Sequence, residues 1–177
     1  MNKKTLVLMV VVALAVGGAI FGPRIAQPAV EAAKAPVILQ SFASKELRPG
    51  DVWKVYLKAS VPEGKMNYIF ATISQPGANR YPISIIRIKG ENQKEFSGYI
   101  YLNTALAVQS NFFNLTLSLS VSVKGTGGFS GPAVFPLSFE AKPSPEAPPD
   151  GAFKEQDLGP IMINLQSVSP GGGGQTR

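Results

Sequence analysis

The side chains best suited to recognise another molecule are tyrosines and lysines that recur with a period of two in two segments. Lys54, Tyr56 and Lys58 alternate with other residues in the first segment, and Tyr99 and Tyr101 do so in the second. Tyrosine combines a large apolar ring with a hydrogen-bonding tip, which is why it is enriched at recognition surfaces. If the two segments are paired strands, these side chains share one outer face. The pattern then predicts either a binding face or cross-strand contacts that only stabilise the sheet.

The groups that most often carry catalysis are missing. The chain of 177 residues has no His and no Cys, which removes the commonest general base, thiolate nucleophiles, disulfides and thiolate metal sites. Its serines lack the Gly-x-Ser-x-Gly and Ser-x-x-Lys arrangements that activate a hydroxyl. The glycine-rich segment Gly125–Gly131 lacks the spacing of a nucleotide-binding loop and precedes a predicted strand instead of a helix. We therefore expect a protein that is not an enzyme and has no cofactor.

The acidic residues form no pattern typical of a carboxylate pair or a metal site. Glycoside hydrolysis needs two acids that converge in a cleft, and calcium favours dense Asp-x-Asp spacing, which is absent here. Most of the acids lie at predicted turns, where water can solvate them. In the central part of the chain they are Glu46, Asp51, Glu63, Glu91, Glu95 and Glu140. We expect no metal site.

The segments that would position these side chains have the pattern of short strands. The clearest is Asn114–Val123, where five aliphatic residues alternate with Thr and Ser, a period that only a strand converts into one apolar face. Turn residues separate it from similar segments, and the predicted strands cover residues 37–43, 52–60, 66–74, 81–89, 95–102, 114–123 and 133–141. Such strands cannot bury their apolar faces in one layer. The sequence therefore predicts an all-β fold, an antiparallel β-sandwich of about seven strands.

Three features of residues 36–142 carry a family resemblance. The Arg48–Asp51 turn leads into Val52–Tyr56, a Pro62–Tyr68 hairpin follows, and a long alternating strand is the penultimate one. In these features the chain resembles the bacterial immunoglobulin-like domains of exported and cell-surface proteins. The resemblance implies an immunoglobulin-like sandwich and an exported location, without a specific activity. Unlike antibody-type domains, the chain has no Cys pair to bridge the sheets, and its only Trp, Trp53, is on the second predicted strand instead of the third.

Residues 1–35 have the pattern of an export signal with a tether. Two lysines precede the uncharged 18-residue stretch Thr5–Gly22, which as a helix would span about 27 Å, close to the ~30 Å of a bilayer's hydrocarbon core. This predicts one N-terminal hydrophobic helix that directs the rest of the chain to the periplasm or the cell surface. Cleavage sites ending at Ala32 and Ala35 are poorly placed. Both a removed signal peptide and an anchor in the inner membrane through residues 5–22 stay open.

Residues 143–177 form a third predicted region. A Pro-rich linker precedes Pro160–Ser167, in which Ile161, Ile163 and Leu165 occupy alternate positions as in a strand, and a Gly-rich tail follows. This strand is expected to add either to an edge of its own sandwich or to an edge of a neighbouring subunit.

Together these features predict a non-catalytic exported module, tethered to the membrane, that binds or spaces proteins of the cell envelope or surface. Residues 35–177 contain 13 basic and 10 acidic residues, a net charge of +3, with no dense basic cluster. Nucleic acid is therefore not expected as a partner. Two alternatives stay open. One is a structural subunit of a surface fibre or pilus-like assembly that polymerises with its own copies by β-strand addition, and the other is a carbohydrate-binding module that uses Tyr56, Tyr99 and Tyr101.

Overall fold

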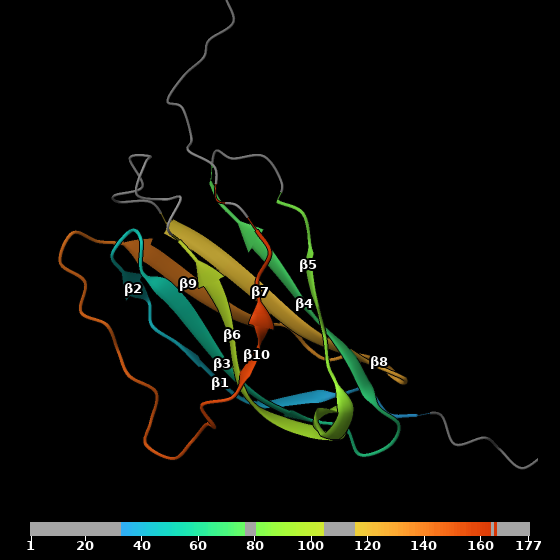
Figure 1. The fold of residues 1–177 in the computed structure, drawn as a ribbon. Helices are drawn as coiled ribbons and strands as arrows, with labels where there is room; N and C mark the ends of the chain where they lie inside the picture. The colour runs from blue at the N-terminus through green and yellow to red at the C-terminus, as the bar shows by residue number, and fades with distance from the viewer. Residues whose placement is uncertain (1–32, 77–80, 105–115, 164, 166–177) are drawn as a thin grey trace, which may run out of the picture. The chain divides into compact units, whose positions relative to one another are not determined.

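The computed structural model describes residues 33–76, 81–104, 116–163 and 165 (Figure 1). The hydrophobic helix predicted at residues 5–22, and with it nearly all of the predicted leader, lies outside these residues. Within the described ranges, no helix has the length and apolar character needed to cross a bilayer.

The described chain is mostly strand, as the sequence predicted, and its strands form two sheets (Figure 1). Sheet A has the order β1-β3-β6-β10, with β1 (Val37–Ala43), β3 (Val52–Ser60), β6 (Glu95–Asn103) and β10 (Asp157–Pro160). Sheet B has the order β2-β9-β7-β4-β5, with β2 (Glu46–Leu47), β9 (Ala133–Phe139), β7 (Thr116–Gly125), β4 (Met66–Ser74) and β5 (Ser84–Arg87). In addition, β8 (Gly128–Phe129) pairs with β7, and the short 3₁₀ helix η1 (Gly90–Gln93) precedes β6.

Both sheets are mixed, whereas the sequence predicted a purely antiparallel sandwich of about seven strands. Six of the eight strand pairings are antiparallel, but β10 runs parallel to β6 and β2 runs parallel to β9. The described residues contain ten strands. The additional strands β2, β8 and β10 are only two to four residues long, which is too short to show a period in the sequence. β10 also contains Gly159 and Pro160, residues that ordinarily argue against a strand.

One hydrophobic core is built from side chains of both sheets. The alternation in β7 puts its leucines and valines into this core and leaves its serines outside. In β3 the core side chains include Trp53, whose indole Nε1 donates a 2.9 Å hydrogen bond to the Ser44 carbonyl, so the polar edge of the ring is satisfied. Burying one such large apolar side chain contributes about 1.5–3 kcal/mol. The core therefore fixes which side chains of each strand point outward.

The residues that follow β10 connect the two sheets on one side of the molecule. Three of their apolar side chains are buried in the core of their own chain, namely Ile161, Ile163 and Leu165. The Ile161 amide donates to the Tyr101 carbonyl of sheet A at 2.7 Å, and the Met162 amide donates to Ser84 Oγ of sheet B at 2.8 Å. The described residues of the segment predicted as a candidate for strand addition thus lie within their own domain in this structure.

The C-terminal strand lies a few residues earlier than the sequence predicted. The ladder with β6 covers Asp157–Pro160, whereas the predicted strand was Pro160–Ser167. Beyond Pro160 the Ile163 amide donates to the Ile161 carbonyl at 3.0 Å, which is a tight turn. The alternating apolar residues of the predicted strand are buried, and they fill the side of the core instead of continuing a ladder.

Candidate functional site

The predicted tyrosine and lysine residues do lie on one face, because β3 and β6 are paired. In this pairing Lys54 is opposite Tyr101, Tyr56 is opposite Tyr99, and Lys58 is opposite Ser97. We call the outer surface of sheet A formed by Lys54, Tyr56, Lys58, Tyr99 and Tyr101 the Tyr–Lys face. The Tyr56 and Tyr99 ring centroids are 5.6 Å apart, and those of Tyr99 and Tyr101 are 6.5 Å apart. Lys54 Nζ lies 4.2 Å from the centre of the Tyr99 ring, a cation–π contact.

A segment of the same chain covers part of this face. Residues 143–156, which we call the strap, connect β9 to β10 along the side of sheet A (Figure 1). The Phe153 ring lies 5.5 Å from the Tyr56 ring. Glu155 accepts hydrogen bonds from Tyr56 Oη at 2.7 Å and from Lys54 Nζ at 2.9 Å. Only 6% of Tyr56 is exposed as a result.

Backbone contacts also hold the strap in place. The Ser144 amide donates to Glu46 Oε2 at 2.9 Å, and the Tyr99 amide donates to the Gln156 carbonyl at 2.8 Å. Gly98 allows the second contact, because a Cβ at this position would overlap the Gln156 carbonyl oxygen. The strap, which includes the Pro143–Asp150 segment predicted as a linker, is therefore attached to the sandwich near both of its ends.

The charges beneath the strap stabilise one another. The pKa of Glu155 is lowered by the hydrogen bonds from Tyr56 and then from Lys54. The pKa of Lys54 is raised, chiefly by its hydrogen bond to Glu155. Burial, followed by the hydrogen bond to Glu155, raises the pKa of the Tyr56 hydroxyl. At neutral pH the cluster thus contains one ion pair and one neutral phenol, with no group prepared to accept or release a proton.

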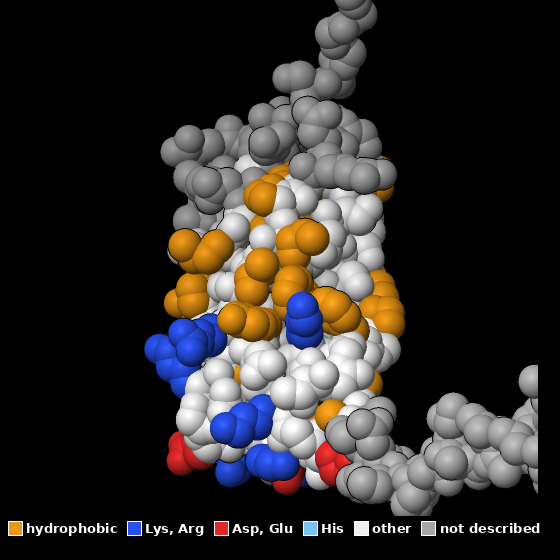
Figure 2. Space-filling model, turned by 90° about the vertical axis from the view of Figure 1, so that its right-hand side faces the viewer, with side chains coloured by type: hydrophobic (Ala, Val, Ile, Leu, Met, Phe, Trp, Pro, Cys, Tyr) orange, Lys and Arg blue, Asp and Glu red, His pale blue; other side chains and the backbone are white. Residues whose placement is uncertain are grey.

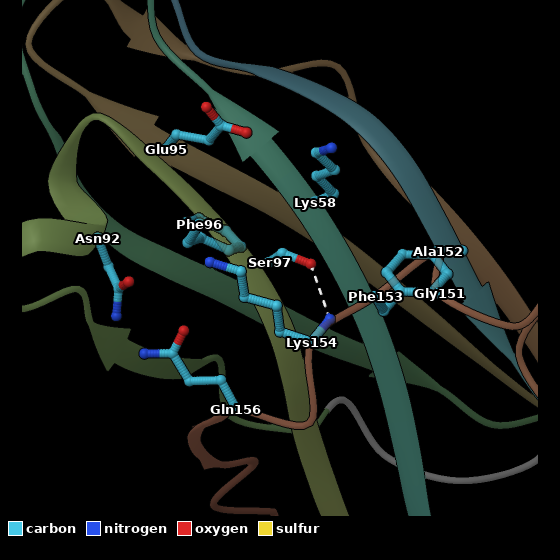
Figure 3. A pocket seen from close by; sticks show the side chains of 10 residues that line it. All are labelled: Lys58, Asn92, Glu95, Phe96, Ser97, Gly151, Ala152, Phe153, Lys154 and Gln156. Atoms are coloured by element: carbon cyan, nitrogen blue, oxygen red, sulfur yellow. Dashed lines mark hydrogen bonds between the residues drawn. The ribbon is translucent and has the colours of Figure 1, made fainter.

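A pocket of about 360 Å³ lies between the strap and the neighbouring end of sheet A (Figure 3). Its charged side chains are those of Lys58, Lys154 and Glu95. Figure 3 shows the side chains of Asn92 and Gln156 close to one another on one side of the pocket, with Lys58 on the other side. The Lys154 amide at its wall donates to Ser97 Oγ at 3.0 Å. The pocket is open and polar, so it could admit a small polar molecule.

The outer surface of sheet B has a different character, because it exposes apolar side chains. Of the nine large apolar side chains that are exposed among the described residues, five lie here, with exposed fractions from 38% to 60%. Together with the half-buried Phe70 they form what we call the apolar face: Tyr68, Phe70, Ile83, Ile85, Phe129 and Val134. The Phe70 ring lies edge-on to the Phe129 ring, with centroids 5.3 Å apart. Figure 2 shows apolar side chains gathered on the side of the molecule where β5 lies, with acidic side chains only at the lower end of the view.

Neither the apolar face nor the strap contacts were predicted from the sequence. A signal for the first exists in Met66–Ser74, where Tyr68 and Phe70 make the outward positions apolar as well as the inward ones. A one-sided strand would carry polar residues there. For the strap, the only local signal is an isolated aromatic residue, Phe153, soon after a Pro-rich stretch.

Comparison of the chain with protein-family models, with curated proteins and with solved structures finds no match in any of the three. The function has to be inferred from the geometry.

Proposed function

We propose that this protein is a non-catalytic, exported immunoglobulin-like module that binds another protein in the cell envelope. The immunoglobulin-like description is supported by the strand order. In immunoglobulin sandwiches the first, second and fifth strands share one sheet, and the third, sixth and seventh share the other. If β2 is counted as a continuation of the first strand and β5 as an extra edge strand, β1, β3 and β6 correspond to the first group and β4, β7 and β9 to the second.

The same order has one unusual feature that fits the proposal. In immunoglobulin sandwiches the fourth strand pairs with the fifth at the edge of the first sheet. Here that place beside β6 is taken by β10, which comes from the C-terminal end of the chain and runs parallel to β6. The strap is the connection that this arrangement requires.

The observation that carries the binding function is the apolar face. Contiguous exposed apolar surface is uncommon on monomeric soluble proteins and marks contact with another molecule. Among the described residues the side of the sandwich away from β1 is closed by the segment after β10, and the Tyr–Lys face is partly covered by the strap. The apolar face has no such cover among the described residues.

The Tyr–Lys face and the C-terminal segment give weaker support to the two alternatives. A glycan could stack on Tyr56 only if the strap moved, because Phe153 contacts the Tyr56 ring and Glu155 accepts a hydrogen bond from the Tyr56 hydroxyl. Polymerisation by strand addition would require Ile161 and its neighbours to leave the core in which they are buried.

Site-specific photo-crosslinking in the native host tests the binding function. A photoreactive amino acid at Ile85, on the apolar face, is expected to give covalent adducts with protein. The matched control is the same amino acid at Lys58, on the outer surface of sheet A. Adducts from position 58 and none from position 85 would contradict the proposal.

Export is tested separately by protease treatment of spheroplasts. The N-terminal sequence supports a chain with residues 36–177 outside the inner membrane, so external protease should digest it while cytoplasmic proteins stay intact. Complete protection of the chain would contradict export. Intact mass then distinguishes a retained leader from a cleaved one.

A further inference from the structure

One row of side chains crosses the apolar face and alternates between cations, which lie beside this face, and aromatic rings that belong to it. On the outer surface of sheet B, Arg87 of β5 is opposite Tyr68 of β4, and Tyr68 is opposite Lys124 of β7. Lys124 in turn is opposite Phe129 of β8, with its Nζ 5.3 Å from the ring centre. All four side chains are exposed. The row therefore has the order cation, ring, cation, ring across four strands.

A second row on the same surface has apolar ends and a polar centre. Thr72 of β4 is opposite Ser120 of β7, and Ser120 is opposite Val134 of β9. On the other side, the register of Ala71 with Ser84 places Ile83, just before β5, next to Thr72. This row has the order apolar, hydroxyl, hydroxyl, apolar.

Both rows are complementary to themselves when reversed. Suppose that two copies face one another with these surfaces, and that the two-fold axis lies between the two sheets, parallel to the strands and above the boundary of β4 and β7. Each row then faces the same row of the other copy in reverse order. Every cation of the first row then lies opposite a ring, and Tyr68 lies opposite Lys124 of the other copy. In the second row, Ile83 lies opposite Val134, and hydroxyl lies opposite hydroxyl.

We propose that the apolar face binds a second copy of this chain in this face-to-face arrangement. The inference rests on the proposed function, because it names the partner of the same binding face. Two packed sheets are rotated relative to one another by about 30°. The ends of a row lie about 7 Å from the two-fold axis, so this rotation moves them by about one residue along the strand relative to the row of the other copy. Tyr68 and Lys124 lie next to the axis and stay opposite, so this contact is the diagnostic one.

Other partners fit the two rows less well. An acidic protein surface would satisfy Arg87 and Lys124 but would set carboxylates beside the negative faces of the rings between them. An anionic membrane would attract the two cations, but its hydrocarbon would leave the hydroxyls of Thr72 and Ser120 without hydrogen-bond partners. A second copy supplies cations for the rings and hydroxyls for the hydroxyls.

The first test uses two substitutions of opposite charge at one position. Sedimentation equilibrium of the full chain in mild detergent measures the dimer dissociation constant of the wild type, Tyr68→Lys and Tyr68→Glu. Tyr68→Lys places a cation opposite Lys124 of the other copy and should weaken the dimer at least tenfold. Tyr68→Glu creates two ion pairs across the axis and should leave the dimer as strong or stronger. A monomeric wild type, or a dimer that responds equally to both substitutions, would overturn the inference.

Thermal unfolding of both variants checks that the fold is retained, because Tyr68→Lys sets three cations side by side within one chain. If that variant does not fold, Ile83→Lys replaces it. Position 83 is 57% exposed, precedes β5 and lies within about one residue of Val134 of the other copy in the proposed dimer, so the dimer should again weaken at least tenfold. An unchanged dimer would overturn the inference.

The second test separates this inference from the proposed function. Crosslinking from position 85 should join two copies of this chain and give a covalent adduct with the mass of two copies. An adduct with a different protein would keep the proposed function and overturn the dimer, and the absence of any adduct would overturn both. Flotation with vesicles of phosphatidylcholine and phosphatidylglycerol provides the membrane comparison. Binding to these vesicles that rises with Tyr68→Lys and falls with Tyr68→Glu would also overturn the dimer.

Discussion

The outer surfaces of the two sheets differ in what covers them. On sheet A the strap places Phe153 on the Tyr56 ring and Glu155 on its hydroxyl, so the most buried aromatic side chain of that surface has partners within the chain. On sheet B the aromatic side chains Tyr68, Phe70 and Phe129 contact one another, and their outer sides are exposed to different degrees.

This difference separates stability from recognition. An aromatic side chain covered by the same chain contributes to the free energy of folding, whereas an exposed one contributes little to folding and is available to a partner. Tyrosines on a strand therefore do not by themselves indicate a binding face. Whether the chain supplies its own cover decides between the two roles, and in the part of the chain that the structure describes, sheet A has that cover and sheet B does not.

The largest effect on this arrangement is expected from Gly98→Val. The new side chain would collide with the Gln156 carbonyl and with Leu158, so the strap and β10 would have to move away from β6. We expect a loss of about 3 kcal/mol in the free energy of unfolding, measured with urea. Gly131→Ala is the matched control, since among the described residues no atom beyond the two chain neighbours lies within 4 Å of a Cβ there. Equal stability of the two variants would mean that the strap is not held as described.

The second largest effect compares two phenylalanines, one on each surface. Phe153→Ala removes the ring that covers Tyr56 and should cost about 2 kcal/mol of unfolding free energy, below the full cost of a buried ring because Phe153 is only partly buried. Phe129→Ala, at a residue that is 51% exposed, should cost at most about 0.5 kcal/mol. If both substitutions cost the same, the distinction between a covered and an uncovered surface is wrong.

The sequence predicted well those features that depend on neighbouring residues. The alternation of Val52–Ser60 located β3, and the turn residues on both sides of Met66–Ser74 located β4, each with its observed bounds. The shared face was predicted on the condition that these two strands pair, and the observed pairing of β3 with β6 places Lys54 and Tyr56 beside Tyr101 and Tyr99. A period of two is a local property, so it can be recognised without knowledge of the rest of the fold.

Features that depend on distant residues could not be predicted in this way. Tyr56 and Glu155 are 99 residues apart in the chain, and no local pattern links them. The parallel strand β10 is defined by its contact with β6, because its own sequence, Asp-Leu-Gly-Pro, is typical of a turn. The first part of the strap, Pro143–Asp150, was interpreted as a linker for the same reason, since Pro-rich composition describes the stiffness of a segment and not what it lies against.

A smaller effect is expected from pH, through Glu155. Its pKa is lowered in the folded chain from the ordinary value of 4.5, so its contribution to stability is present above pH 4.5 and is lost as the pH falls through the folded-state pKa. The contribution should be at most about 0.5 kcal/mol, because the ion pair with Lys54 is largely exposed to solvent. Glu155→Gln should therefore be less stable than the wild type at pH 7 and should lose this difference under more acidic conditions. A difference that is constant with pH would contradict the described hydrogen bonds to the carboxylate.

The smallest effect on stability is expected at an exposed position of the apolar face. Ile85 and Ile86 are neighbours in β5, but 57% of Ile85 is exposed and only 7% of Ile86. Ile86→Thr should cost about 2 kcal/mol, because it removes buried apolar contacts and buries a hydroxyl. Ile85→Thr should change the unfolding free energy by at most about 0.5 kcal/mol, since Thr also has high strand propensity. In that case isoleucine and threonine at position 85 stabilise the monomer about equally. The apolar surface of Ile85 would then be explained by contact with a partner and not by the stability of the monomer. A loss above about 1 kcal/mol at position 85, measured with urea below the dimer dissociation constant, would assign the apolar face to the fold and remove the main argument for a binding function.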